Sequence, residues 1–295
     1  MDKAKYQDVY PSAPLLDSAA DTRPSAAALL TLEYFEAEPD AMPRQVFAQH
    51  HILLNLNDEP HRVENWRDEE YRDFTFRKDE IVVTPAGVRS GWRWHSPSKV
   101  IVITLEPARF ERFSQFEVGI LLAGTQLASL PQFKDPDICY AGVMLKDALA
   151  SDEQGSHLIF ESLARVFLVK LIQKYGLREE EYAFSTSFTA KHYQWVLAYV
   201  AANYSTSIQV EGLARETALS TSHFAQLFKK TIGMSPMQFV TAYRVEQARK
   251  RLPHRDTPLI DIALACGFAD QAHFSRVFKQ ATGESPSSYR ARLRS

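Results

Sequence analysis

Two short stretches, fifty residues apart, place hydrogen-bonding and cationic side chains at intervals of three and four. This spacing puts each set on one face of an α-helix. Such groups recognise a partner by hydrogen bonding and charge. The two sets are Ser222, Ala225, Gln226 and Lys229 in the first stretch, and Ala272, Ser275, Arg276 and Lys279 in the second.

The opposite face of each stretch is apolar, with Phe224, Leu227 and Phe228 in the first copy and Phe274, Val277 and Phe278 in the second. The features that delimit a helix repeat at the same interval. Ser220 and Asp270 are suitable N-caps, and Gly233 and Gly283 suit a left-handed helix end. Ser235-Pro236 and Ser285-Pro286 then begin another helix. One supersecondary unit is therefore present twice.

A short apolar helix is predicted before each capped helix, with a tight turn between them. In the first copy the apolar positions include Val210 and Leu213, and in the second they include Leu259 and Ile262. Two helices joined by a tight turn, the second with a polar outer face, form the helix-turn-helix of DNA-binding proteins.

The runs Phe-Lys-x-x-x-Gly-x-Ser-Pro and Cys-Gly-Phe-x-Asp-x-x-x-Phe-Ser-x-x-Phe-Lys resemble those of the AraC/XylS family of bacterial transcription regulators. The resemblance implies an all-α DNA-binding domain over residues 190–295, with two helix-turn-helix units joined by a helix near 236–252. It also implies that each protein chain reads an asymmetric site from two successive major grooves, about 34 Å apart.

Carrying the family's DNA-contacting positions onto this sequence assigns side chains on both helices. Arg276 suits guanine and Gln271 suits adenine, while lysines suit phosphates. The outer face of the first helix has no arginine or tryptophan. We therefore expect the second unit to contribute more of the sequence specificity that comes from hydrogen bonds to bases. The assigned residues are Thr221, Ser222, His223, Ala225, Gln226, Lys229, Lys230, Gln271, Ala272, His273, Ser275, Arg276 and Lys279.

Charge and composition agree with a two-domain chain. The 295 residues have a net charge of −2, but residues 188–295 carry 14 Lys and Arg against 7 Asp and Glu, a net charge of +7. A basic half is what phosphate contact requires.

Cys139 and Cys266 are the only cysteines, which gives no basis for a disulfide framework. With neither an apolar signal core nor a long apolar run, a cytoplasmic protein without membrane contact is expected.

The first half changes character along its length. Residues 1–28 have no periodicity and are predicted to form a flexible arm, whereas residues 30–105 alternate with a period of two, which is typical of strands. We predict seven strands in a β-sandwich or jelly roll. They are Leu30–Glu36, Gln45–Leu56, Arg62–Trp66, Tyr71–Phe76, Glu80–Thr84, Ser90–Trp94 and Val100–Leu105.

The run Asp79 to Gly87 resembles the second cupin motif and retains its Pro-x-Gly turn. The resemblance implies a cupin-like β-barrel with flanking helices, and hence an α+β two-domain protein. A metal-binding cupin would have histidine where this chain has Ser90. The adjacent His50 and His51 would also face opposite sides of a strand. We therefore expect no metal, no cofactor and no enzymatic activity. A cupin-type enzyme with an appended DNA-binding domain is the alternative.

Aromatic walls with a few polar groups are typical of small-molecule pockets. Trp92 and Trp94 share one face of their strand, and His51 lies on a face with other polar residues. Effector contact is proposed for Arg44, His51, Trp92, Trp94 and His95, with ordinary core packing as the alternative, since tryptophans and histidines in a barrel most often belong to the core. A further alternative is that the barrel binds no small molecule and serves only for dimerisation or for binding a protein partner.

Residues 108–175 are predicted to be helical at Ala108–Phe116, Val143–Leu149 and Ser156–Tyr175, with a loop at Pro131–Pro136. The last helix has a wide apolar stripe, and in related regulators a helix here forms the dimer. Leu158, Leu163, Val166 and Lys170 are therefore candidates for a homodimer contact, with packing inside the chain as the alternative.

The predicted domains are a cupin-like effector-binding and dimerisation domain over 29–178, a linker over 179–189, and the DNA-binding domain over 190–295. The family resemblance favours an activator controlled by an effector or signal. Double-stranded DNA, a small-molecule effector, a second copy of the chain and RNA polymerase are the partners it implies.

Overall fold

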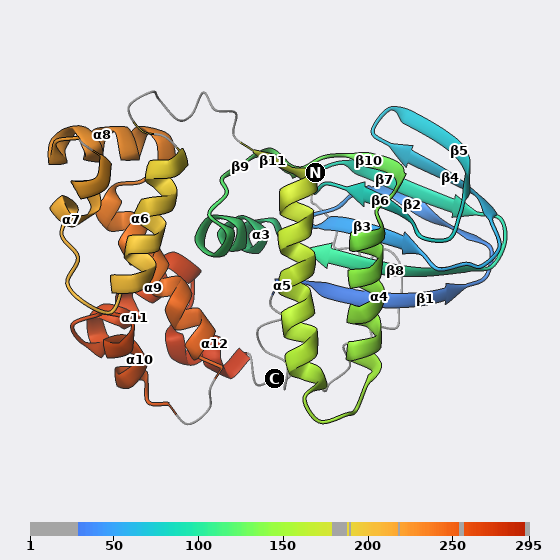
Figure 1. Ribbon diagram of the computed structural model, residues 1–295. Coiled ribbons are helices and arrows are strands. Elements are labelled where there is room, and N and C mark those ends of the chain that lie inside the picture. The colour runs from blue at the N-terminus through green and yellow to red at the C-terminus, as the bar shows by residue number, and fades with distance from the viewer. Residues whose placement is uncertain (1–28, 179–187, 189, 218, 254–256, 293–295) are drawn as a thin grey trace. The chain divides into compact units, whose positions relative to one another are not determined.

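The computed structural model describes residues 29–178, 188, 190–217, 219–253 and 257–292. The chain divides into two compact units, an N-terminal unit over 1–178 and a C-terminal unit over 179–295 (Figure 1). The arm predicted over 1–28 lies outside the described residues, and so does almost all of the predicted linker.

The described part of the N-terminal unit contains two large antiparallel sheets and a small two-stranded one. The five-stranded sheet has the order β1-β8-β3-β6-β10, and the four-stranded sheet has the order β2-β7-β4-β5. Period-two alternation explains both, because one face of each strand points to the other sheet. The strands are β1 Thr31–Ala37, β2 Asp40–Val46, β3 His50–Asn55, β4 His61–Arg67, β5 Glu70–Phe76, β6 Glu80–Thr84, β7 Arg89–Trp94, β8 Ser98–Leu105 and β10 Leu130–Lys134.

The described strands form a sandwich, one of the two architectures predicted, and the cupin-like barrel that the resemblance implies is not closed. The run Gln45–Leu56, expected as one strand, is divided between β2 and β3. β2 pairs with β7 in one sheet, whereas β3 pairs with β6 and β8 in the other. The chain therefore crosses between the sheets at residues 47–49, and no described strand belongs to both sheets.

Three helical segments follow the strands. They are α3 Pro107–Phe113 with a π-helical extension at Ser114–Val118, α4 Pro136–Ala150 and α5 Ser156–Tyr175. Helices α4 and α5 run side by side and cover the five-stranded sheet (Figure 1). One apolar cluster, with Ile52, Ile103, Leu145 and Phe167, fills the space between sheet and helices. A second, with Phe47, Val82 and Trp92, fills the space between the sheets.

The region between α3 and α4 differs from its prediction. The loop expected at Pro131–Pro136 is largely strand β10, which pairs with β6 and has an irregular register between Leu130 and Phe133. Proline is tolerated there because β10 is an edge strand. Two further strands, β9 Leu122–Leu127 and β11 Gly176–Arg178, pair with each other and were not predicted.

The C-terminal unit is helical. Its helices are α6 Ala190–Asn203, α7 Val210–Ala214 with a 3₁₀ turn at Arg215–Thr217, α8 Thr221–Ile232, α9 Pro236–Arg251, α10 Leu259–Ala265, α11 Gln271–Thr282 and α12 Pro286–Arg292. The two predicted helix-turn-helix pairs are thus α7 with α8 and α10 with α11, and α9 joins them. Among the described residues, no helix has the length and apolarity needed to cross a membrane.

Candidate nucleic-acid interface

The ends of α8 and α11 are formed as the repeat predicts. The Ser220 hydroxyl accepts a hydrogen bond from the backbone N–H of His223, and the Asp270 carboxylate accepts one from the N–H of His273 at 2.7 Å. Both helices end at a glycine in the left-handed conformation, Gly233 at φ 80° and Gly283 at φ 84°. These caps satisfy backbone groups that each helix end would otherwise leave unpaired.

An aromatic core repeats in the two units. Phe224 and Phe228 of α8 contact each other with ring centroids 5.5 Å apart, and Phe228 meets Phe239 of α9 edge to face at 5.5 Å. In the second unit Phe274 and Phe278 are also 5.5 Å apart, and Phe278 meets Tyr289 of α12 at 5.4 Å. Each capped helix is therefore held to the helix that follows it by the same contact.

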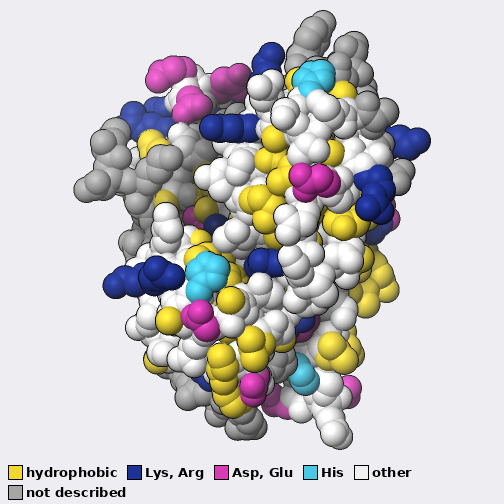
Figure 2. Space-filling view, turned by 90° about the vertical axis from the view of Figure 1, so that its left-hand side faces the viewer, with side chains coloured by type: hydrophobic (Ala, Val, Ile, Leu, Met, Phe, Trp, Pro, Cys, Tyr) yellow, Lys and Arg dark blue, Asp and Glu magenta, His cyan; other side chains and the backbone are white. Residues whose placement is uncertain are grey.

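The outer faces of the two helices are exposed at matching positions. Ser222 and Ala272, Gln226 and Arg276, and Lys229 and Lys279 are all exposed, whereas Ala225 and Ser275 are half-buried. Because the same positions point outward in both copies, the two faces are equivalent in geometry and differ in chemistry. Figure 2, which looks onto the C-terminal unit, shows Lys, Arg and His side chains standing out from this surface.

Several arginines of this unit are engaged within it. Arg244 donates to the backbone oxygens of Tyr204 and Thr206 at 2.8 and 2.7 Å, and Arg251 donates to the Tyr204 hydroxyl at 2.6 Å. Arg292 pairs with Glu284 at 2.7 Å. No pattern in the sequence indicates these hydrogen bonds and this ion pair.

By contrast, the cations on the two outer faces form no ion pair or hydrogen bond with any described residue. These are Lys229, Lys230, Arg276 and Lys279. An exposed cation without an internal partner can approach a phosphate or a base without breaking a protein contact. The charge of the C-terminal unit is therefore available at the surface that the repeat exposes.

The structure places all thirteen predicted contact residues on α8 and α11. Exposed among them are Ser222, His223, Gln226, Lys229, Lys230, Gln271, Ala272, Arg276 and Lys279. Half-buried are Thr221, Ala225, His273 and Ser275. His273 also packs edge to face against Phe268 at 5.7 Å, so its ring is partly occupied inside the unit.

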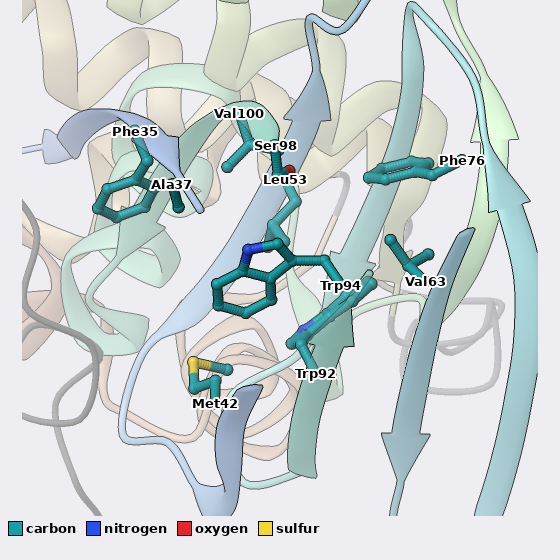
Figure 3. A pocket seen from close by; sticks show the side chains of 10 residues that line it. All are labelled: Phe35, Ala37, Met42, Leu53, Val63, Phe76, Trp92, Trp94, Ser98 and Val100. Carbon is teal, nitrogen blue, oxygen red and sulfur yellow. The ribbon is translucent and has the colours of Figure 1, made fainter. Parts of the chain in front are cut away.

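In the N-terminal unit, a cavity of about 50 Å³ lies between the two sheets. Trp92 and Trp94 project into it from β7, facing Leu53 and Val100 of the other sheet (Figure 3). The full lining is Phe35, Ala37, Met42, Leu53, Val63, Phe76, Trp92, Trp94, Ser98 and Val100. Two of the five predicted effector residues thus line one cavity.

The other three predicted effector residues lie elsewhere. Arg44 is exposed and donates to the backbone oxygen of Asp68, and His95 is exposed with Nε2 2.8 Å from Glu64 Oε1. His51 is fully buried between the sheets, and burial, reinforced by the charge of Arg67, lowers its pKa to about 3. His51 is therefore neutral at physiological pH.

His50 and His51 face opposite sides of the five-stranded sheet, as predicted. His50 Nδ1 accepts a hydrogen bond from the backbone N–H of Ala86, and its Nε2 lies 3.0 Å from Gln126 Oε1. It therefore holds the Pro-Ala-Gly turn in place. Among the described residues, no group of three or more His, Cys, Asp or Glu side chains is arranged to hold a metal ion.

The polar interior between the sheets was not predicted in full. Asn65, Arg67 and Ser90 are buried there, with exposed fractions of 1%, 5% and 0%. The sequence does contain an indication of this polar interior. Residues two apart on a strand share a face, which places His61, Val63, Asn65 and Arg67 together on one face of β4. Polar side chains at the inward positions of a strand mark either a hydrogen-bonded interior or a binding site.

The predicted dimer residues occupy a partly exposed face of α5. Leu158 and Val166 are 61% and 46% exposed, whereas Leu163 is half-buried against the core. Lys170 pairs with Asp137 of α4 at 3.2 Å. Packing inside the chain uses the other face, with Phe160, Phe167 and Leu171 fully buried.

Comparison with known proteins finds a family model, curated relatives and solved structures that are similar to this chain. Residues 213–292 match the model of a helix-turn-helix domain. The transcriptional activator RhaS of Yersinia pestis is 33% identical over 149 residues, which cover 50% of this chain and 52% of RhaS. The chain thus spans about half the length of the curated relatives it matches.

Among solved structures, a probable AraC family regulator from Rhodopseudomonas palustris is 31% identical, covers 36% of this chain and 99% of its own, and has a TM-score of 0.33. The DNA-binding domain of AdpA, solved with a target DNA, is 30% identical, covers 34% and 91% of the two chains, and also scores 0.33. The sequence matches agree with the repeated caps, aromatic contacts and signature runs of the two units. The C-terminal helical unit is therefore a helix-turn-helix domain similar to those of the AraC/XylS family.

Proposed function

We propose that this protein is a transcription regulator that binds double-stranded DNA through α8 and α11. The observation that supports it best is the pair of outer faces, which are exposed at matching positions and differ in side-chain chemistry. A duplicated unit whose interior repeats and whose exterior has diverged can read two different half-sites. The RhaS relatives are named transcriptional activators, which favours activation over repression.

Within this proposal, Arg276 forks onto guanine O6 and N7, and Gln226 or Gln271 pairs with adenine. Lys229, Lys230 and Lys279 contact phosphates, because they lie in the later turns of the helices and have no partner among the described residues. Selecting bound sites from random DNA with the purified protein tests this. An asymmetric site with two half-sites about one helical turn apart supports it. Enrichment of no sequence would contradict it.

The protein is further proposed to act as a homodimer through the exposed face of α5. An apolar stripe with Leu158, Ile159 and Val166 all about half exposed or more is unusual on a single helix and suits a twin helix. Replacing Val166 by glutamate should then shift sedimentation equilibrium of the full chain toward the monomer. A wild-type chain that is strictly monomeric at micromolar concentration would contradict the dimer.

An activator also needs a productive contact with RNA polymerase, and transcription from a template carrying the selected site tests that step.

We propose in addition that a small molecule bound between the sheets of the N-terminal unit controls DNA binding. Such control requires different affinities of the ligand for two states of the protein. The cavity beside Trp92 and Trp94 supports the location.

A further inference from the structure

Four polar side chains form a block on the inner face of the four-stranded sheet. Asn65 of β4 is paired in register with Trp92 of β7, and Arg67 is paired with Ser90. Residues two apart on a strand share a face, and directly opposite residues on paired strands have neighbouring Cβ atoms about 5 Å apart. The four side chains therefore meet in the space between the sheets. Arg67 shows this directly, because it reaches Thr84 Oγ1 of the opposite sheet at 2.6 Å.

Each of these side chains keeps one buried polar atom that no described residue satisfies. The atoms are Asn65 Oδ1, Arg67 Nε, Ser90 Oγ and Trp92 Nε1. Leaving a buried polar group unsatisfied is unfavourable, and four such groups in one place are not explained by packing. The orientation of Asn65 is fixed by its Nδ2, which donates to the Gly91 backbone oxygen at 3.0 Å. Its Oδ1 is therefore left as an acceptor.

Arg67 brings a buried cation to the block, on which the carboxylates of Asp68 and Glu70 act without touching it. It is 5% exposed, and its described partners are neutral: the Val83 backbone oxygen at 2.7 Å, Thr84 Oγ1, and Ser129 Oγ at 2.9 Å. Burial lowers its pKa to about 10, so the guanidinium remains charged at neutral pH. A buried cation whose direct hydrogen-bond partners include no carboxylate can accommodate an anion. The exposed Ser129 connects the block to the surface between β9 and β10.

The cavity next to the block is apolar. Trp92 belongs to both, and the other lining groups are hydrocarbon or aromatic apart from the Ser98 hydroxyl and the Trp94 indole. The Ser98 hydroxyl lies 3.4 Å from His61 Nε2, and the Trp94 N–H already donates to the Glu38 backbone oxygen at 2.6 Å. A sugar needs a hydrogen-bonding partner for nearly every carbon, so this lining does not suit one. At about 50 Å³ the space holds roughly four heavy atoms.

We propose that the space between the sheets binds a small carboxylic acid with an apolar body. Its carboxylate accepts hydrogen bonds from Arg67, Ser90 and Trp92, and its body enters the cavity beside Trp94. Asn65 Oδ1 accepts from a hydroxyl on the neighbouring carbon, so a 2-hydroxy acid binds more tightly than its parent. The assignment rests on the proposed effector control and names the chemical class of the effector.

The test uses the full-length protein, thermal denaturation and calorimetric titration with butyrate, 2-hydroxybutyrate, benzoate, their neutral amides and glucose. We expect an acid to raise the melting temperature in a concentration-dependent way and its amide to have at least tenfold weaker affinity. Binding of the amide as tightly as the acid, binding of glucose alone, or binding of none of them would overturn the proposal.

Three variants separate a ligand site from an ordinary core. Ser90→Ala removes a hydroxyl that has no partner among the described residues, so it should not lower the melting temperature of the free protein. Trp92→Phe removes an N–H without a described partner together with part of a buried ring, so it should lower the melting temperature through the cavity that it leaves. Both should weaken acid binding at least fivefold. Trp94→Phe is the matched control, because it breaks the hydrogen bond to Glu38 and should lower the melting temperature while the preference for acid over amide persists.

Loss of stability in Ser90→Ala, with unchanged acid binding in both Ser90→Ala and Trp92→Phe, would show that the Ser90 hydroxyl is satisfied structurally, and would overturn the assignment. DNA binding is measured on the same wild-type preparation. Sequence-specific DNA binding without acid binding refutes only the ligand class. Absence of sequence-specific DNA binding refutes the regulator itself, whatever the acid does.

Discussion

Gln226 and Arg276 occupy equivalent exposed positions on α8 and α11, fifty residues apart, with the same buried phenylalanines two positions before and after them. An amide and a guanidinium at one geometric position read different bases, because glutamine matches the edge of adenine and arginine matches the edge of guanine. The divergence of this pair is the simplest reason for a duplicated unit to recognise an asymmetric site.

Replacing Arg276 by alanine should cost about 1–3 kcal/mol of binding at one position of the selected site. The reason is the loss of two hydrogen bonds to one guanine. The measurement compares wild-type and variant affinity on duplexes that differ at single positions. An equal loss on every duplex would show instead that Arg276 contacts a phosphate.

Replacing Lys229 or Lys279 by alanine should weaken binding to all sequences alike. Each phosphate contact that is lost should also reduce the slope of log affinity against log salt concentration by about 1. Lys78→Ala is a suitable control, since Lys78 is paired with Asp58 in the N-terminal unit. An unchanged slope in both lysine variants would remove these residues from the interface.

Two glycines of the second helix-turn-helix unit should respond differently to alanine. At Gly283 a methyl group meets nothing within 4 Å, so the cost is only that of a left-handed residue, about 1–2 kcal/mol. At Gly267, with φ 78°, the methyl group would collide with the backbone oxygen of Tyr204. Chemical denaturation should therefore show a larger loss for Gly267→Ala, and equal losses would contradict this account of the turn.

The stability of the N-terminal unit should depend on pH through His51. Its pKa is about 3 in the folded protein against an ordinary histidine value of 6.5, so between these pH values the unfolded chain binds the proton more readily. Stability should therefore fall as pH drops below 6.5, by about 1.4 kcal/mol per pH unit from this residue. Burial also lowers the pKa of His50 and His61, which adds in the same direction.

The measurement is urea denaturation at pH 7.5 and pH 5, followed by tryptophan fluorescence. Three of the four tryptophans lie in the N-terminal unit, so a Trp195→Phe background reports on that unit. His51→Leu in this background should flatten the pH dependence. The same slope with and without His51 would show that other groups are responsible.

The C-terminal unit was predictable because its information is local and duplicated. The caps Ser220 and Asp270 and the terminal Gly233 and Gly283 have the predicted roles, and helix α5 has the predicted bounds. The N-terminal unit depends on pairing between distant segments. The division of Gln45–Leu56 between two sheets and the edge strand that contains Pro131 follow from that pairing, and no local pattern shows them.

The same contrast applies to the sites. Helical periodicity is enough to place Gln226 and Arg276 outside, because each helix has one buried face. The polar block between the sheets depends on the register that opposes Arg67 to Ser90 and Asn65 to Trp92. The alternation along β4 shows that Asn65 and Arg67 share a face, but only the sheet shows which residues oppose them.

In the proposed function, the outer faces of α8 and α11 read two different half-sites. Exchanging their chemistry, with Gln226→Arg and Arg276→Gln in one protein, and repeating the selection of sites from random DNA tests this. We expect the guanine preference assigned to Arg276 to move from the α11 half-site to the α8 half-site. Selection of the wild-type site by the exchanged protein would contradict it.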